Sequence, residues 1–363
     1  MTTHRIGVMT GGGDAPGLNA VIRAIVKHGV GHLHWQVVGI EDSFNGLLDS
    51  PRRLQDLTLK SCQGLLPRGG TILGTTNRGD PFAWEDGKGG VQDRGAELAA
   101  AIRDEGLEGI ISIGGDGSQR IVWRLMREHG IPVIHVPKTI DNDLADTDFT
   151  FGFWSAVEVA TEALDRLHTT AEAHDRVMLL EVMGRSAGWI ALYAGVAGGA
   201  DVIVLPELPY DPDRICRKIL RRRGLGRQFT LIVVAEGAAP AEGDTVPEAQ
   251  EHGRGRIVSG GAANTLARLI AERLDVDIRV TVLGHLQRGG SPVPFDRVLA
   301  TRFGIHAVEL VDRGEWGRLV RLDNGLITSI PLAEVDPEPR LVSLDHPLIH
   351  EAVAVGIELG AAT

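Results

Sequence analysis

Short apolar runs alternate with stretches whose apolar positions recur at helical spacing along most of this chain. This alternation predicts an α/β fold, with mostly parallel sheets covered by helices on both faces. The predicted strands are Arg5–Met9, Val37–Ile40, Gly109–Ile113, Pro132–Val136, Arg176–Glu181, Val202–Leu205, Leu231–Ala235 and Val280–Leu283. The predicted helices are Leu18–Gly29, Gly95–Glu105, Ser118–His129, Ser155–Glu172, Ser186–Gly195, Pro212–Arg222 and Gly261–Arg273.

Two regions depart from this pattern. Ala238–Gly255 is rich in Gly, Pro, Glu and Ala, a composition that predicts an exposed loop. From about Arg318 onward, short strand-like runs are mixed with prolines, and the chain ends in a small predicted helix.

Length and composition narrow the class of protein. The 363 residues suffice for about two domains, and 43% hydrophobic residues predict a packed core. The longest apolar runs, such as Ile110–Ile113, are too short to span a bilayer, and the N-terminus lacks the apolar core of a signal peptide. With only Cys62 and Cys216, a disulfide framework is not expected. These features predict a cytoplasmic enzyme without a membrane partner.

The net charge of −11 argues against nonspecific nucleic-acid binding. An anionic ligand must therefore be held by local basic side chains and backbone amides. Many of the 47 glycines cluster at predicted strand ends, where a bare backbone can approach a ligand closely.

The segment Pro137–Asp143, Pro-Lys-Thr-Ile-Asp-Asn-Asp, concentrates polar chemistry directly after an apolar run. Open α/β sheets hold ligands at the carboxyl ends of their strands. One carboxylate, Asp141 or Asp143, can accept a proton while the other holds a metal or orients the first. Taken alone, the segment also fits an Asp/Asn-rich turn that caps its own backbone.

Two glycine-rich segments each join a predicted strand to a predicted helix. Gly11–Gly17 could bring backbone N–H groups to a phosphate, although it matches neither a Walker loop nor a dinucleotide fingerprint, and a tight turn is the alternative. In Gly114–Ser118, the Asp116 carboxylate is well placed to hold Mg²⁺ beside a nucleotide's phosphates, or to cap the helix. Two such loops at strand ends of one sheet favour phosphate binding.

Two later segments bring an arginine to a strand end. They are Met183-Gly184-Arg185 and Gly284–Gly290, and a planar guanidinium suits phosphate. His285 and Gln287 in the second segment can bind sugar hydroxyls. A surface salt bridge is the alternative role for each arginine.

Taken together and in order, these motifs resemble the 6-phosphofructokinase family. The resemblance covers roughly residues 5–310. It implies transfer of a phosphoryl group from ATP, with Mg²⁺, to the 1-hydroxyl of fructose 6-phosphate. It also implies the phosphofructokinase fold: two Rossmann-like three-layer domains, with 1–152 plus about 289–340 binding the donor and 153–288 plus about 341–363 binding the sugar. The later motifs argue against an NAD or lipid kinase, and the intact carboxylates argue against a non-enzymatic phosphosugar sensor.

The resemblance assigns roles to individual residues. Asp141 is the base, with Thr139 and Asp143 beside it, and Asp116 is the Mg²⁺ ligand. The donor is met by Gly12, Gly13, Gly115, Asp116, Gly117 and Ser118. The substrate, fructose 6-phosphate, is bound by Thr139, Ile140, Asp141, Arg176, Met183, Gly184, Arg185, Glu236, Arg279, His285, Leu286, Gln287 and Arg288, of which His285, Arg279 and Arg288 meet its phosphate. Arg176 and Arg279 are implied to reach a neighbouring subunit's site, which predicts a homodimer or homotetramer.

The donor signature is a hybrid. Relatives that use pyrophosphate typically carry Asp where Gly117 stands and Lys where Lys138 stands, whereas familiar ATP enzymes carry Gly at both places. A side chain at position 117 would fill space that ATP needs, so Gly117 favours ATP, and pyrophosphate is the alternative donor.

Other positions depart from the family pattern. Asn77 takes the place of a donor-binding arginine, with Arg78 one residue later. The family's effector-site pattern is only partly kept: Arg23 and Lys27 match, Asp201 replaces a usual Glu, and the basic run near Arg221–Arg223 is arranged differently. This weakens the expectation of allosteric control.

Overall fold

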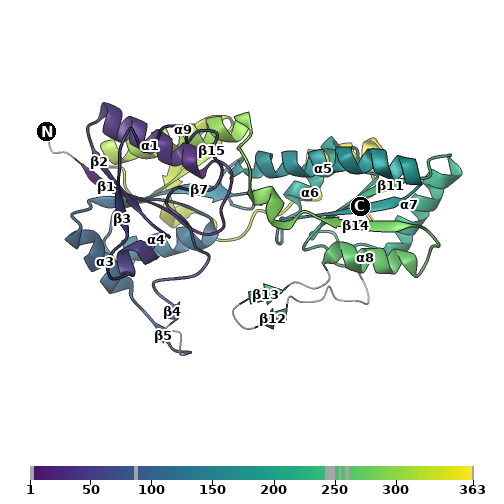
Figure 1. Ribbon diagram of the computed structural model, residues 1–363, viewed down its shortest axis with the longest axis horizontal. Helices are drawn as coiled ribbons and strands as arrows, with labels where there is room; N and C mark the ends of the chain where they lie inside the picture. The colour runs from purple at the N-terminus through teal and green to yellow at the C-terminus, as the bar shows by residue number, and fades with distance from the viewer. Residues whose placement is uncertain (1–3, 86–88, 242–249, 253–254, 258–260, 362–363) are drawn as a thin grey trace. The chain divides into compact units, whose positions relative to one another are not determined.

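The computed structural model describes residues 4–85, 89–241, 250–252, 255–257 and 261–361, and it divides into two compact units (Figure 1). Unit 1 comprises residues 1–140, 144–155 and 288–338. Unit 2 comprises residues 141–143, 156–287 and 339–363. The chain therefore passes between the units within the Pro137–Asp143 motif.

Unit 1 is built on an eight-stranded, mostly parallel sheet in the order β16-β15-β7-β6-β1-β2-β3, with β8 paired to β7. Its strands are β1 (Arg5–Thr10), β2 (Gln36–Ile40), β3 (Leu54–Leu57), β6 (Gly109–Gly114), β7 (Val133–Thr139), β8 (Phe151–Gly152), β15 (Arg318–Asp323) and β16 (Leu326–Pro331). The antiparallel pairs are β2 with β3 and β15 with β16. A separate hairpin joins β4 (Trp84–Glu85) to β5 (Val91–Gln92).

Helices cover both faces of this sheet (Figure 1). They are α1 (Leu18–His32), α2 (Asn45–Leu48), α3 (Gly95–Asp104), α4 (Asp116–His129) and α9 (Pro294–Asp312), with the short 3₁₀ helix η2 (Leu332–Glu334). Because side chains alternate along a strand, Ile111 packs in the cluster with α1 and α9, whereas Ile110 packs in the cluster with α3 and α4. A Cβ atom at Gly304 of α9 would lie 2.8 Å from the Val21 carbonyl oxygen, so glycine there permits close packing of α9 on α1.

Unit 2 has a four-stranded parallel sheet in the order β10-β11-β9-β14. The strands are β9 (Val177–Val182), β10 (Val202–Val204), β11 (Thr230–Ala235) and β14 (Ile278–Val282). The helices are α5 (Phe153–His174, which begins in unit 1), α6 (Trp189–Ala197), α7 (Pro212–Gly224), α8 (Ala262–Ala271), the 3₁₀ helix η1 (Gly284–Arg288) and α10 (Pro347–Ala354). Val177 and Leu179 of β9 face the core under α7 and α8, while Met178 faces the opposite side, against Ala171 of α5.

The predicted α/β fold with mostly parallel sheets is confirmed. Each predicted strand and helix is present, with ends shifted by a few residues. Helix α9 was not predicted, and β7 runs through Thr139, so Pro137–Thr139 belong to the strand instead of following it. Among the described residues, no helix is long and apolar enough to cross a membrane.

The predicted loop Ala238–Gly255 is only partly described, because residues 242–249 and 253–254 lie outside the described residues. Of its described parts, Ala238 is buried, and β12 (Gln250–His252) pairs antiparallel with β13 (Gly255–Ile257).

Candidate active site

The first glycine loop lies at the carboxyl end of β1 in unit 1. The Gly11 amide donates to the Ile113 carbonyl at 2.9 Å, and the Gly12 amide donates to the Thr76 carbonyl at 3.0 Å. Gly12 has a φ of 78°, a left-handed conformation that glycine adopts without strain. The loop is thereby fixed against the end of β6.

The second glycine loop adjoins the first. A Cβ atom at Gly11 would lie only 2.5 Å from the Ser118 hydroxyl oxygen, and one at Gly114 would lie 2.6 Å from the same oxygen. Glycines at both positions therefore let β1, β6 and the start of α4 come together. The structure thus brings the two predicted phosphate loops side by side in unit 1, at the N-terminus of a helix.

Gly117 and Asp116 occupy the first turn of α4. A Cβ atom at Gly117 would meet no heavy atom within 4 Å, so the absence of a side chain there is not required by packing. The Asp116 side chain is 53% exposed, and its Oδ2 pairs with Arg120 at 3.3 Å. Both residues therefore face open space at the helix N-terminus.

Two cations reach the first glycine loop. The Lys138 Nζ, on a buried side chain of β7, donates to the Gly13 carbonyl at 2.5 Å. The Arg288 Nη1 donates to the Asp14 carbonyl at 3.0 Å and would lie 2.7 Å from a Cβ atom at Gly13. The Gly11–Asp14 backbone is therefore held between a lysine and an arginine.

A buried histidine supports the second loop. The His135 Nε2 on β7 bonds with the Gly114 carbonyl at 3.1 Å. The pKa of His135 is lowered from 6.5 to about 3, mainly by burial and in smaller part by the nearby charge of Lys138, while the bond to Gly114 opposes the shift. His135 is therefore neutral at physiological pH and donates from Nε2.

The loop that carries Asn77 and Arg78 lies against the first glycine loop. Besides the bond from Gly12 to Thr76, the Thr75 hydroxyl donates to the Gly12 carbonyl at 2.6 Å. Asn77 and Arg78 are both exposed beyond this contact. The structure thus brings both Asn77 and Arg78 near the predicted donor loop. It does not favour one of them over the other as the residue that contacts the donor.

The predicted base lies where the chain enters unit 2. Asp141 and Asn142 are buried, and Asp143 is half-buried. Asn142 has a φ of 53°, an uncommon left-handed conformation for a residue other than glycine. Of the neighbouring residues in the motif, Ile140 is fully buried, and the Thr139 carbonyl accepts from the Thr150 hydroxyl at 2.8 Å in unit 1.

The segment Met183–Arg185 follows β9 in unit 2 and is braced by a carboxylate. The Glu236 Oε1 accepts from the Gly184 amide at 3.2 Å and from the Arg185 amide at 2.8 Å. Gly184 has a φ of 150° and Arg185 one of 53°, so the turn is sharp, and the Arg185 side chain is exposed at its tip. Glu236 thus fixes the turn that presents Arg185.

The Gln287 side chain forms hydrogen bonds within the protein interior. Its side chain is fully buried; Oε1 accepts from the Met183 amide at 2.7 Å and Nε2 donates to the Ala156 carbonyl at 3.2 Å. Both ends of the amide are therefore engaged within unit 2. Its neighbours His285 and Leu286 are exposed.

Arg176 and Arg279 share one carboxylate. The Arg176 Nε donates to the Asp277 Oδ2 at 2.6 Å, and Arg279 pairs with the Asp277 Oδ1. Hydrogen bonding from Arg176 lowers the pKa of Asp277. The two arginines predicted to reach another subunit therefore lie together near the start of the edge strand β14.

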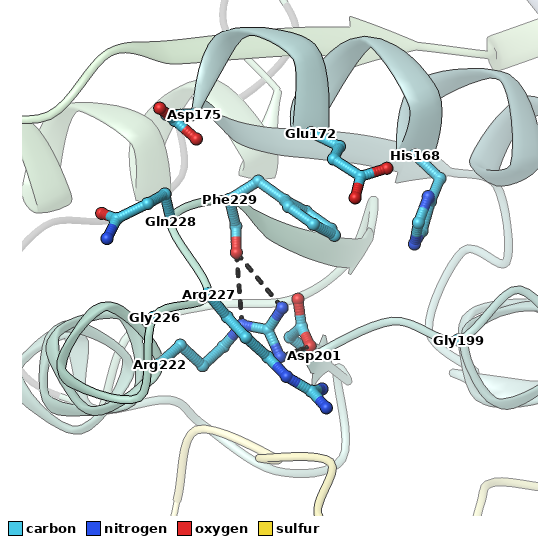
Figure 2. Close-up of a pocket in the computed structure, with 10 residues that line it drawn as sticks. All are labelled: His168, Glu172, Asp175, Gly199, Asp201, Arg222, Gly226, Arg227, Gln228 and Phe229. Carbon is cyan, nitrogen blue, oxygen red and sulfur yellow. Dashed lines mark hydrogen bonds and ion pairs between the residues drawn. The ribbon is translucent and has the colours of Figure 1, made fainter.

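A cavity of about 520 Å³ lies elsewhere in unit 2 (Figure 2). It contains Asp201, one of the positions where the effector-site pattern is altered. Asp201 forms a largely buried ion pair with Arg222, whose Nε and Nη2 also each donate to the Phe229 carbonyl at 3.2 Å. Arg222 is thus committed to contacts within the cavity wall.

Arg340 was not singled out from the sequence, yet it contacts the Asp141–Asp143 segment. Its guanidinium Nε and Nη2 donate to the Asn142 carbonyl at 3.3 and 3.0 Å. The two residues are 198 positions apart in the chain, and a lone arginine in an irregular segment gives no sequence signal of such a contact.

Comparison with known proteins identifies the family of this chain. The phosphofructokinase family model matches residues 5–311. The chain belongs to the phosphofructokinase family. The recognised resemblance and the enzyme class are thereby confirmed.

Individual members of the phosphofructokinase family show how far the likeness extends. An ATP-dependent 6-phosphofructokinase of Chloroflexus aurantiacus is 50% identical over 98% of each chain. A pyrophosphate–fructose 6-phosphate 1-phosphotransferase of Streptomyces coelicolor is 46% identical over 97% of this chain and 99% of that one. The crystal structure of Pichia pastoris phosphofructokinase aligns with a TM-score of 0.77 at 30% identity, covering 92% of this chain but only 35% of that one. Relatives with either donor thus stand at similar identity.

Proposed function

We propose that this phosphofructokinase transfers the terminal phosphoryl group of ATP to the 1-hydroxyl of fructose 6-phosphate, giving fructose 1,6-bisphosphate. The observation that carries the choice of ATP is the open position at Gly117, where a Cβ atom would meet nothing within 4 Å. Protein packing would allow a side chain at position 117. We therefore explain the glycine by the space that the rest of the nucleotide, beyond its terminal phosphates, would occupy.

Unit 1 binds the donor in this proposal. The backbone N–H groups of Gly13 and Gly115 and the N-terminus of α4 offer a positive electrostatic surface to phosphate, while the Gly12 amide is used on the Thr76 carbonyl. Lys138 adds a cation beside the first loop. Phosphoryl transfer depends mainly on positioning and charge neutralisation, which these groups supply.

Asp116 fits the proposed Mg²⁺ ion. The structure places its exposed carboxylate at the start of α4, beside Gly115 and Gly117. Mg²⁺ is commonly held by one or two carboxylates together with substrate phosphates and water, so a single carboxylate at this place suits it. When bound, the ion neutralises charge on the transferred phosphate.

Most of the proposed sugar-binding residues belong to unit 2. Asp141 accepts the proton of the 1-hydroxyl as it attacks, and Thr139 and Asp143 help to orient the reacting groups. The turn Met183–Arg185, held by Glu236, surrounds the sugar. The sugar phosphate meets His285, Arg279 and Arg288; among the described contacts Arg288 uses one N–H on Asp14, which leaves others for an anion.

Gln287 acts indirectly in this proposal. Because its amide bonds to Met183 and Ala156, it positions the Met183–Arg185 turn instead of contacting a hydroxyl. Leu286, exposed beside it, remains available to the sugar or to another subunit.

We further propose a homodimer or homotetramer whose sites are completed by Arg176 and Arg279 of a neighbouring copy. Their clustering on Asp277 near the edge strand β14 supports this. A cytoplasmic location fits the two free, buried cysteines.

Pyrophosphate remains the second candidate donor. The buried Lys138 favours it, because pyrophosphate users typically carry lysine at this place, and the Streptomyces coelicolor relative is named for that donor.

The activity is tested by incubating the full chain with fructose 6-phosphate, Mg²⁺ and either donor, and identifying the sugar product. Fructose 1,6-bisphosphate should form with ATP, and EDTA should abolish its formation. Absence of product with both donors would contradict the proposed activity.

A further inference from the structure

The C-terminal segment, residues 339–346, lies outside the motifs that identify the family and makes direct contact with the segment that carries the predicted base. The Arg340 amide donates to the Asp143 carbonyl at 2.8 Å. Its guanidinium donates twice to the preceding carbonyl, that of Asn142. One residue thus supplies three N–H groups to the two peptide oxygens that directly follow Asp141.

The backbone held in this way has a left-handed conformation at Asn142, with a φ of 53°. Asparagine is one of the few residues other than glycine that adopts this conformation readily. The guanidinium N–H groups of Arg340 fix the direction of the carbonyl that ends this turn.

Arg340 is itself held in place from the other side. The Trp189 Nε1 donates to the Arg340 carbonyl at 2.8 Å, and the Arg340 Cζ lies 4.9 Å from the centre of the Trp189 ring. Two residues later, the Glu207 Oε1 accepts from the Val342 amide at 2.8 Å and from the Gly188 amide at 2.9 Å. The segment is therefore anchored to the start of α6, just after the turn that presents Arg185.

We propose that Arg340 is a positioning residue for phosphoryl transfer: it fixes the Asn142–Asp143 backbone so that the Asp141 carboxylate points at the sugar hydroxyl. This inference rests on the proposed function of Asp141 as the base. It assigns the C-terminal segment a role in the reaction itself, in addition to packing.

The physical consequence is a loss of alignment without a loss of donor binding. Displacement of a catalytic group by about 1 Å can cost about 10²-fold in rate. The contacts described above for Arg340 are with Asn142, Asp143 and Trp189, all residues of unit 2. Removing Arg340 should therefore act on kcat, with little change in the KM for ATP.

The test compares Arg340→Ala, Arg340→Lys and Trp189→Phe with the matched control Arg214→Ala. The control removes another anchor of the C-terminal part of unit 2, the 2.8 Å pair between Arg214 and Glu358, without touching Asp141–Asp143. We expect about a 10²-fold lower kcat for Arg340→Ala, an intermediate loss for Arg340→Lys, a smaller loss for Trp189→Phe and a kcat within twofold of wild type for Arg214→Ala. The KM for ATP should stay within twofold throughout.

Added guanidinium ion provides a readout that a purely structural role would not move. It should restore part of the kcat of Arg340→Ala and leave Arg214→Ala unchanged. Arg340→Lys and Trp189→Phe keep the test decisive if Arg340→Ala fails to fold, as judged from its circular dichroism.

A wild-type kcat in Arg340→Lys and Trp189→Phe, or equal losses of kcat in Arg340→Ala and Arg214→Ala, would overturn the assignment. Failure of the proposed function is a separate result, since it would leave the wild-type protein without fructose 6-phosphate turnover before any variant is compared.

Discussion

The Lys138 ammonium group donates a hydrogen bond to the carbonyl oxygen of Gly13, linking the end of β7 to the first glycine loop. The lysine side chain is only 3% exposed, so its charge is directed into the loop and away from bulk solvent. Lys138, whose identity suggests pyrophosphate, therefore also holds the first glycine loop in place. Binding of either donor would need that loop.

Replacement of Lys138 by methionine should lower turnover with both donors. The change keeps much of the side-chain volume but leaves the Gly13 carbonyl without this donor and removes a cation from the loop, for which we expect about a 10²-fold loss in kcat/KM. Steady-state kinetics with each donor measure it. A loss confined to pyrophosphate would show that Lys138 serves only that donor.

Substitution at Gly117 should alter the choice of donor while leaving the fold intact. Because a Cβ atom there meets nothing within 4 Å, Gly117→Ala and Gly117→Asp should both keep a melting temperature near that of wild type. The aspartate adds bulk and negative charge where we place ATP, so kcat/KM for ATP should fall at least about tenfold, equivalent to 1.4 kcal/mol. Alanine should cause a smaller loss. Unchanged ATP kinetics in Gly117→Asp would mean that the nucleotide lies elsewhere.

Asp141→Asn tests the proposed base. An amide of the same shape cannot accept the hydroxyl proton, so kcat should fall by about 10²–10⁴, while the dissociation constants for both substrates, measured calorimetrically, stay within a few-fold. Asp146→Asn is the matched control: it retains an oxygen for the Asp336 amide and should keep kcat within twofold. Equal kcat losses in the two variants would contradict the role of Asp141.

His135 predicts an acid-sensitive contribution to stability. Its pKa is about 3 when folded and near 6.5 when unfolded, so the unfolded chain takes up a proton first as the pH falls. This group therefore lowers the free energy of unfolding between about pH 6.5 and 3, by up to about 1.4 kcal/mol per pH unit. His135→Gln keeps a donor for the Gly114 carbonyl and removes the titration.

Denaturant unfolding at pH 7.5 and pH 5 measures this effect. Wild type should lose about 2 kcal/mol more than His135→Gln over that interval, counting the part below pH 6.5. Equal losses in the two proteins would show that His135 does not titrate as inferred.

The sequence predicts those features of this molecule that depend on residues close together in the chain, and it predicts contacts between distant segments poorly. The strands and the two glycine loops follow from local pattern, because apolar runs predict buried strands and the glycines at their ends predict close backbone turns. Helix α9 was missed although Pro294 at its first position and Asp296 in its first turn are typical signals of a helix start.

The site illustrates the same limit. A sequence marks Gln287 as an amide at a strand end, but only the fold reveals that the side chain turns inward to Met183. Likewise, the contact between Arg340 and Asn142 joins segments that are distant in the chain, and no local pattern encodes it.

The ratio of kcat/KM for ATP to that for pyrophosphate, each measured with saturating fructose 6-phosphate and Mg²⁺, tests the central claim most directly. We expect ATP to be preferred by at least about 10²-fold, a difference of about 2.7 kcal/mol. A preference for pyrophosphate would contradict the assignment of ATP, and the absence of turnover with either donor would contradict the proposed activity as a whole.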